Sequence, residues 1–455
     1  MVFADAPRPE RRAEMINHIT TGLVSSALVF AFSAATAAQT SISASEREAA
    51  ITALAQVIED EFFDAERAVQ IADSLRTANA DGAFNTAGEA EALAAALTAR
   101  LSEEDRHFGV NYAGPEAVAA ANAPRESRPR PSDGDRWAGL RRQNFGFASV
   151  EILPGNIGYI DLRMFAPIEP AEATARAALE FIAGTDAVIF DVRQNGGGAP
   201  SMVQYLVSHF LEPGGDTLIN TFVSRDYEYP NQLWSLPSHP AGFRPDVPLY
   251  VLTSGRTGSA GEAFPYHLQA LERATLIGET TYGAGNPGGT FLVDEGFSIF
   301  VSTGSARNPV TGTNWETTGV VPDIPVSADD ALDTALADAY STLLEGDVGG
   351  SARLGLEWGL ESLQLRDNPA SVDAAQLARY AGSYGIRSFT VENGRLMYSR
   401  DGAPAVAMEA LGDHRFRLPD DDEARFVFQM NRSGPATRMD LQLLSGRVIA
   451  NPRND

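Results

Sequence analysis

The stretch Leu252-Thr-Ser-Gly-Arg-Thr-Gly-Ser-Ala-Gly-Glu262 decides the fold of this 455-residue chain. The apolar run 248–253 predicts a buried strand, and the spacing after the glycine-rich turn predicts a helix from Ser259 to Arg273. The same order of elements surrounds Phe190-Asp-Val-Arg-Gln-Asn-Gly-Gly-Gly198, between an apolar strand at 187–192 and a helix at 201–211. Strands that alternate with crossover helices form a parallel-containing sheet covered on both faces. Apolar and polar residues alternate over 291–302, which is typical of an antiparallel addition to the sheet. We therefore expect an α/β fold with a mixed sheet flanked by helices.

The regions before and after this core have different sequence patterns. Before it, Ile51, Leu54 and Ile58 recur at helical spacing, which indicates about three helices between 45 and 98. After it, short alternating strands are separated by turns such as Asn393-Gly394, a strong hairpin signal. The predicted boundaries are a signal peptide at 1–38, a helical N-terminal cap at 39–110, a linker or loop at 111–147, the core at 148–345, a helical linker at 346–376 and a small all-β domain at 377–455.

The first residues have the pattern of a secretory signal. Arg8, Arg11 and Arg12 precede an apolar run from 19 to 35, and small residues follow up to Ala38. We therefore expect export to the periplasm or the medium, with cleavage near Ala37 or Ala38 and no stable membrane span afterwards. A retained N-terminal membrane anchor is the alternative.

The composition excludes several classes of protein. Asp and Glu number 60 against 35 Lys and Arg, a formal net charge of -25, so the chain lacks the basic surface that nucleic acids require. There is no cysteine, which removes thiolate metal sites and Cys nucleophiles. There is also no lysine, which removes P-loops, Schiff-base enzymes and Ser–Lys dyads. No metal or organic cofactor is expected, and the oligomeric state stays open.

Ser259 is the first candidate for chemistry. The pattern places it between a buried strand and a helix, at the carboxyl end of the sheet, where open α/β folds place their sites. The amide of Ala260 would then lie at a helix N-terminus, where the dipole favours a developing oxyanion. The structural alternative is an ordinary capping box, since Ser259-x-x-Glu262 has its spacing.

Three further segments carry candidate groups. The turn Asn195-Gly196-Gly197-Gly198 can present bare backbone amides to a carbonyl oxygen, whereas Asp191 and Arg193 before it are expected to form a structural ion pair. His107, in Glu103-Glu-Asp-Arg-His107, is a near-neutral base, although a lone histidine is more often a surface or core residue. Glu316, in Asn314-Trp-Glu316, would by itself be an ordinary solvated carboxylate.

Taken together, these motifs resemble a family. The order His107, D-x-R-x-N-G-G-G at 191–198, T-S-x-x-T-x-S-A-x-E at 253–262, G-E-T-T-x-G at 278–283 and N-W-E-x-x-G-V-x-P-D at 314–323 is similar to the tail-specific (C-terminal processing) serine peptidases. The resemblance is greatest to the branch of tricorn protease and the interphotoreceptor retinoid-binding protein modules, and it covers roughly 46–326. It implies a ClpP/crotonase-like core. It also implies that Ser259 is the nucleophile, His107 the general base and Glu316 the supporting carboxylate. The oxyanion hole would be made by the amide of Ala260 and by one glycine of the turn 195–198, for which Gly197 is the first choice.

The chain departs from the family pattern at three places. The processing branch uses a Lys base in a T-x-G-K-G turn, and here the turn reads Thr281-Tyr-Gly-Ala284-Gly, so a histidine must serve. Tricorn-like members carry a Ser just before the catalytic His, where this chain has Arg106. About forty residues separate His107 from residue 148, too few for the PDZ domain of the processing branch.

The leading hypothesis is an exported serine peptidase that cleaves peptides or proteins through an acyl-enzyme on Ser259. An unperturbed imidazole base would make kcat/KM fall below a pKa near ~6.5. The alternatives are a non-catalytic module that binds a hydrophobic, retinoid-type ligand on the same scaffold, or an esterase or amidase, since one triad serves all acyl transfers. The last domain resembles the small lipocalin-like β domains appended to bacterial serine hydrolases, and its role stays open.

Overall fold

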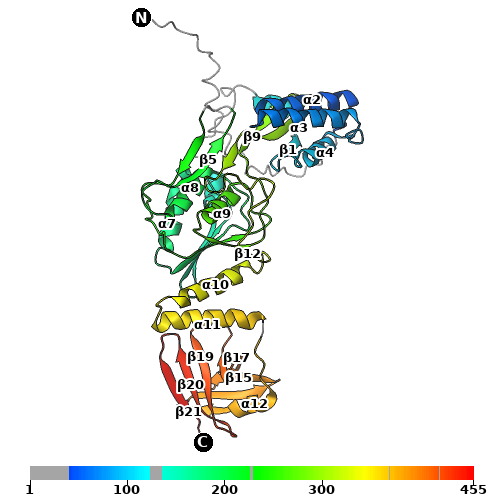
Figure 1. The fold of residues 1–455 in the computed structure, drawn as a ribbon. Helices are drawn as coiled ribbons and strands as arrows, with labels where there is room; N and C mark the ends of the chain where they lie inside the picture. The colour runs from blue at the N-terminus through cyan, green and yellow to red at the C-terminus, as the bar shows by residue number, and fades with distance from the viewer. Residues whose placement is uncertain (1–39, 123–135, 226–228, 368, 420, 455) are drawn as a thin grey trace, which may run out of the picture. The chain divides into compact units, whose positions relative to one another are not determined.

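The chain folds as two compact units in a computed structural model, which describes residues 40–122, 136–225, 229–367, 369–419 and 421–454 (Figure 1). The first unit runs to Glu151 and takes in Tyr159–Gly184 and Val188–Ala331. The second comprises Ile152–Gly158, Thr185–Ala187 and Leu332–Asp455. The predicted signal peptide and residues 123–135 of the predicted linker lie outside the described residues.

A six-stranded mixed sheet forms the centre of the first unit. Its order is β12-β8-β7-β4-β3-β2, and β4, β7, β8 and β12 are paired in parallel. β2 and β3 are joined by the turn 154–156, which only an antiparallel pair permits. The strands are β2 (Phe147–Leu153), β3 (Ile157–Leu162), β4 (Ala187–Asp191), β7 (Leu249–Thr253), β8 (Thr275–Gly278) and β12 (Ile324–Pro325).

Three helices cover this sheet (Figure 1). They are α7 (Ile168–Phe181), α8 (Pro200–His209) and α9 (Ala260–Ala270). Every residue of β4 and β7 is buried, as expected for strands covered on both faces. Phe165, Phe190 and Phe264 are fully buried at the centre of the resulting core. The predicted mixed α/β core is confirmed.

The N-terminal helices build a core of their own. They are α2 (Ala44–Glu61), α3 (Ala65–Ala80) and α4 (Ala90–Leu101), and Ser43 and Glu46 close a capping box at the start of α2. Leu54, Leu75 and Leu97 pack together and against Phe297 of β10 (Phe297–Ser302). β10 pairs with β9 (Gly288–Val293) on one side and with β1 (Gly109–Tyr112) on the other. The β1–β10 pairing holds the segment just before β1, which carries His107.

Two parts of the first unit differ from the sequence prediction. The segment 111–147, expected to be a linker or loop, contains α5 (Pro115–Asn122), α6 (Ala138–Arg142) and the short helix η3 (Asn144–Gly146). α5 starts with a proline, which suits the first helical position, and alanines follow it. A three-stranded sheet, β11-β5-β6, was not expected; it consists of β5 (Leu218–Val223), β6 (Asn231–Trp234) and β11 (Ser305–Arg307).

The second unit combines helices with two antiparallel sheets. The helices are α10 (Ala331–Glu345), α11 (Gly350–Asp367) and α12 (Ala374–Tyr380). One sheet holds β13 (Gly382–Tyr384), β14 (Arg387–Glu392), β15 (Arg395–Arg400) and β16 (Val406–Ala407); the other holds β17 (Glu409–Gly412), β18 (Arg415–Arg417), β19 (Ala424–Met430), β20 (Ala436–Leu443) and β21 (Val448–Pro452). The aromatic residues Phe389, Phe416 and Phe428 lie in the core of this unit. Among the described residues, no helix combines the length and the apolar character needed to cross a bilayer.

Candidate active site

Ser259 lies at a strained point between β7 and α9. Its φ is 53° and its ψ is -123°, a left-handed backbone conformation that costs a non-glycine residue about 1–3 kcal/mol. Such strain persists only where the surrounding structure holds it, and it is common at nucleophiles on sharp strand-to-helix turns. The backbone therefore distinguishes Ser259 from an ordinary N-cap serine, whose φ is negative, as at Ser43.

The contact that holds this turn comes from Glu262. Its carboxylate is completely buried and accepts four hydrogen bonds: from the N–H of Ser259 (2.8 Å), the hydroxyl of Thr281 (2.5 Å) and the N–H groups of Gly283 (2.6 Å) and Ala284 (2.9 Å). Burial raises the pKa of Glu262, while these hydrogen bonds act in the opposite direction. The residue predicted as half of a capping box thus also connects the Ser259 backbone to the turn 281–284.

We expect Glu262→Gln to destabilise the protein by roughly 3 kcal/mol, because a buried donor without its partner costs about 1–3 kcal/mol. Each oxygen of the Glu262 carboxylate accepts two of the four hydrogen bonds. In either orientation of the glutamine side chain, its NH2 group therefore replaces one of these acceptors and leaves two donors without a partner. Urea unfolding measures the effect. Glu279→Gln is the matched control, since the exposed Glu279 carboxylate also accepts from two backbone N–H groups. Equal losses in the two variants would contradict the role given to Glu262.

The oxyanion donors are only partly as predicted. Ala260 is the first residue of α9, so its amide has no partner within the helix. The N–H of Gly197, however, donates to the Asn195 side chain at 2.9 Å. This overturns the choice of Gly197 as a free donor. Gly197 instead allows close approach, since a Cβ there would lie 2.9 Å from that of Ser259.

Gly198 is the better candidate for the second donor. It lines the same cavity as Ser259 and Ala260, and its amide has no hydrogen-bond partner among the described residues. Its φ is 140°, and a Cβ at this position would lie 2.0 Å from the carbonyl oxygen of Phe165. Only glycine fits here, which keeps the backbone bare at the edge of the cavity.

The imidazole of His107 lies between two carboxylates. Its Nδ1 is 3.6 Å from Glu316 and 3.7 Å from Asp105, and its ring stacks on Phe300 of β10. The Nδ1 atom is buried and makes no hydrogen bond within the described residues. The structure thus brings the predicted pair His107 and Glu316 together, and it leaves Nε2 as the nitrogen available to another group.

Backbone donors fix Glu316 in place. Its carboxylate accepts from the N–H groups of Gly285 (2.6 Å), Asn286 (3.0 Å) and Arg106 (3.1 Å). Arg106, at the position of the family's serine, therefore contributes its main chain, and its guanidinium lies over the ring of Tyr282. Glu316 connects the turn after β8 to the segment that carries His107.

Asp105 is the functional candidate that sequence reasoning missed. It is 1% exposed, accepts from the His107 N–H at 2.8 Å and from the Asn286 side chain at 3.2 Å. In the sequence, Asp105 is an acidic residue two positions before His107. It is the last of three consecutive acidic residues, and the sequence does not show which of the three contacts the imidazole.

The two carboxylates change the acidity of His107. Burial alone would lower the pKa of this imidazole, but Asp105 and Glu316 outweigh burial and raise it to about 9. His107 is therefore protonated at neutral pH in the resting protein. This raised pKa differs from that of an ordinary imidazole, which lies near ~6.5.

Ser259 and His107 line one cavity of about 440 Å³ together with Ala260 and Gly198. Among the described residues, no hydrogen bond joins the Ser259 hydroxyl to His107. The arrangement fits a protonated imidazole held by its carboxylates, and catalytic hydrogen bonds often form only when substrate binds.

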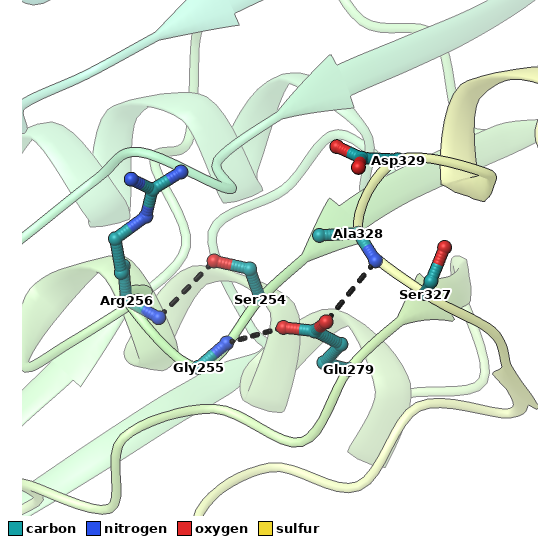
Figure 2. Close-up of a pocket in the computed structure, with 7 residues that line it drawn as sticks. All are labelled: Ser254, Gly255, Arg256, Glu279, Ser327, Ala328 and Asp329. Carbon is teal, nitrogen blue, oxygen red and sulfur yellow. Dashed lines mark hydrogen bonds between the residues drawn. The ribbon is translucent and has the colours of Figure 1, made fainter.

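A second cavity, of about 320 Å³, lies beside the loop that precedes Ser259 (Figure 2). The Glu279 carboxylate accepts there from the N–H groups of Gly255 and Ala328, each at 3.2 Å. This contact joins the loop after β7 to the segment after β12. None of the residues predicted for catalysis lines this cavity.

A cation could in principle be ligated by Asp105, His107 and Glu316, whose ligand atoms lie within 4.8 Å of one another. The Glu316 carboxylate, however, already accepts three hydrogen bonds from backbone N–H groups. The Asp105 carboxylate accepts one from a backbone N–H group and one from a side-chain amide. A metal would have to displace these donors. The donor set fits a protonated imidazole better than a metal ion.

The other candidates have structural roles. Arg193 forms the predicted ion pair with Asp191 and also donates to the carbonyl of Ala328. His209 is buried, and burial lowers its pKa to about 4, so it is a neutral core residue.

Residues 156–326 match the profile of peptidase family S41. This match relates the segment to a family of serine-type hydrolases. The segment that carries the glycine turn, Ser259 and Glu316 belongs to peptidase family S41, as the motifs predicted. His107 lies before the matched segment.

The chain is also similar to individual proteins. It is 29% identical over 183 residues to the chloroplastic carboxyl-terminal-processing peptidase 2 of Arabidopsis thaliana, covering 38% of this chain and 34% of that one. It is 24% identical over 205 residues to the carboxy-terminal processing protease CtpA of Bacillus subtilis, covering 45% and 42%. The chain thus matches less than half the length of these relatives.

The similarity of the chain to solved structures is low. The photosystem II D1 C-terminal processing protease is 14% identical, with a TM-score of 0.39 over 62% of this chain and 93% of that one. Tricorn protease is 13% identical, with a TM-score of 0.44 over 66% and 37%. Both scores are low, and the family assignment rests on the sequence match.

Proposed function

We propose that this protein is a peptidase that hydrolyses peptide bonds through an acyl-enzyme on Ser259, with His107 as the general base. The observation that carries the proposal is the single cavity lined by Ser259, His107, Ala260 and Gly198. It combines a nucleophile on a strained turn, a base held by carboxylates and two backbone amides in one place.

The reaction follows from these positions. The Ser259 oxygen attacks the peptide carbonyl and its proton passes to Nε2 of His107, while the amides of Ala260 and Gly198 bind the oxyanion. The carbon–nitrogen bond then breaks, and the leaving amine takes the proton from His107. A water molecule attacks the acyl-enzyme by the same route, which releases the acid and restores Ser259. Asp105 and Glu316 stabilise the imidazolium that forms in each half.

Labelling with a fluorophosphonate tests this proposal, because the reagent reacts with activated serines. We expect the label on Ser259, located by mass spectrometry, and none on Ser259→Ala. Ser254, five residues earlier and hydrogen-bonded to the Arg193 carbonyl, is an internal control that should stay unlabelled. A folded protein that takes up no label would contradict the peptidase and favour the hydrophobic-ligand module.

We also propose that the chain is exported and that the sequence before residue 39 is removed. The arginines at 8, 11 and 12 and the apolar run 19–35 support this proposal. The intact mass of the chain recovered from its native host tests it, and a mass that includes residues 1–38 would contradict it.

A further inference from the structure

The cavity beside Ser259 extends past the catalytic groups along one face of α9. Ala260, Ala263 and His267 all line it, at the spacing of residues that share a helix face. Next to this helix face, one part of the wall comes from the sheet β11-β5-β6 and from α8, with the apolar side chains Val203, Phe222, Leu233 and Ala306. The mechanism uses none of these side chains.

Asn220 supplies a buried polar group to this wall. It lies on β5, is 2% exposed and lines the cavity. Its Oδ1 makes no hydrogen bond among the described residues. A buried carbonyl without a partner is costly, so an unpaired Asn220 in a cavity points to a ligand that completes it.

His267 supplies a second polar group of opposite character. The carbonyl oxygen of the Asn308 side chain accepts from the N–H groups of Val310 and Thr311, which leaves its NH2 group to donate to Nδ1 of His267 at 3.0 Å. Nδ1 is therefore an acceptor, and the ring carries its proton on Nε2. Burial lowers the pKa of His267 to about 3, so the ring is neutral over the working range of a peptidase.

Strand pairing brings the two groups near one another. Thr221 of β5 is opposite Arg307 of β11 in the last pair of this antiparallel register, and Asn220 and Asn308 are the residues next to that pair on the two segments. Because Asn308 donates to His267, an unpaired acceptor and an N–H donor lie on neighbouring parts of one wall.

The cavity lacks a partner for a charged side chain. Of its lining residues only Arg106 and His107 carry charge, and no acidic residue is among them. A basic side chain would therefore lose its solvation without gaining a counter-ion, which is unfavourable.

The distance along α9 favours a long side chain. His267 follows Ser259 by eight residues, about 12 Å along a helix, and its Cβ points back toward the N-terminus. A side chain that leaves the scissile residue above Ser259 must cross the apolar part of the wall before it reaches these polar groups.

We propose that this cavity receives the side chain of the residue just before the scissile bond, and that it selects a long neutral side chain whose end both donates and accepts a hydrogen bond, glutamine above all. This inference rests on the proposed peptidase function. The glutamine NH2 group would donate to Asn220 and its carbonyl would accept from Nε2 of His267, with its methylene groups against Val203 and Leu233.

The test compares peptides that differ only at this residue. We expect kcat/KM for glutamine to exceed that for methionine, which has a similar shape and no such hydrogen bonds, by about tenfold or more, and lysine to be the poorest. Asn220→Leu should reduce the glutamine-to-methionine ratio about tenfold, and the isosteric Asn220→Asp should raise the lysine-to-glutamine ratio. Asn231→Leu, an exposed asparagine on β6, should keep the wild-type ratios. Equal or better cleavage after methionine or lysine by the unaltered protein overturns the proposal.

Binding without chemistry separates this inference from the peptidase proposal. Ser259→Ala should bind acyl-peptides ending in glutamine more tightly than those ending in methionine, as measured by calorimetry. That preference together with an unlabelled Ser259 would reject the peptidase and keep the subsite. If Ser259 is labelled but glutamine peptides bind no more tightly than methionine peptides, the peptidase proposal stands and the proposed subsite is rejected.

Discussion

Ser259→Ala is expected to lower kcat by about 10⁴- to 10⁶-fold, and His107→Ala should fall to a similar floor. The reason is that the serine is a weak nucleophile until the imidazole takes its proton, so removing either group removes the same step. The double variant should be no slower than the single ones. Steady-state hydrolysis of a peptide, with the fluorophosphonate labelling rate as a second readout, measures all three.

His414→Ala serves as the control for loss of a histidine. His414 lies in the second unit, where Nδ1 is 2.7 Å from the Tyr380 hydroxyl oxygen, and its removal should leave kcat within about twofold. His107→Ala with nearly full activity would show that another group acts as the base. Because the chain contains no lysine, that group could not be the base of the processing branch.

The elements that carry Ser259 could be predicted because their signals are local. The apolar strand 248–253, the glycine turn and the helix after it lie within one stretch, and β7 and α9 occupy it almost as expected. The sheet β11-β5-β6 gave no such signal, since its strands are three to six residues long and β11 pairs with β5 from far along the chain. The missed sheet holds Asn220 and so supplies a wall of the cavity.

The roles of single groups at the site depended on tertiary contacts. The family pattern indicated Ser259, His107 and Glu316, but not that Asp105 would be buried beside the same imidazole. Likewise, the glycine turn pointed to a bare amide, and only the fold shows that Asn195 takes the N–H of Gly197 and leaves that of Gly198. A pattern of residue types identifies groups, whereas hydrogen-bond partners arise from segments that meet in space.

The two carboxylates around His107 lead to the second large effect, an alkaline pH profile. The base must be neutral to accept the proton of Ser259, and with a pKa of about 9 only about 1% of His107 is neutral at pH 7. We therefore expect kcat/KM to rise about tenfold per pH unit between pH 6 and 8 and to level off near pH 9. A profile that is flat over this range, or that levels off near pH 6.5, would contradict the raised pKa.

Variants of the carboxylates test its cause. Asp105→Asn and Glu316→Gln should each move the midpoint of the pH profile to lower pH. The shift for Asp105→Asn should be at least as large as that for Glu316→Gln, because Asp105 raises the pKa of His107 more than Glu316 does. Glu103→Gln is the matched control: this acid lies in the same segment but is 73% exposed, and it should leave the midpoint unchanged. A loss of rate at every pH without a shift of the midpoint would indicate a purely structural role for Asp105.

The same shift links activity to stability with opposite sign. A histidine whose pKa is raised on folding stabilises the folded state fully below its unfolded pKa, and this contribution is lost as the pH rises through the folded value. A shift from 6.5 to about 9 corresponds to about 3 kcal/mol, which should disappear between pH 6.5 and 9 in the unaltered protein. His107→Ala should lack this dependence in urea unfolding. The protein thus loses this stabilisation over the pH range in which its base becomes able to act.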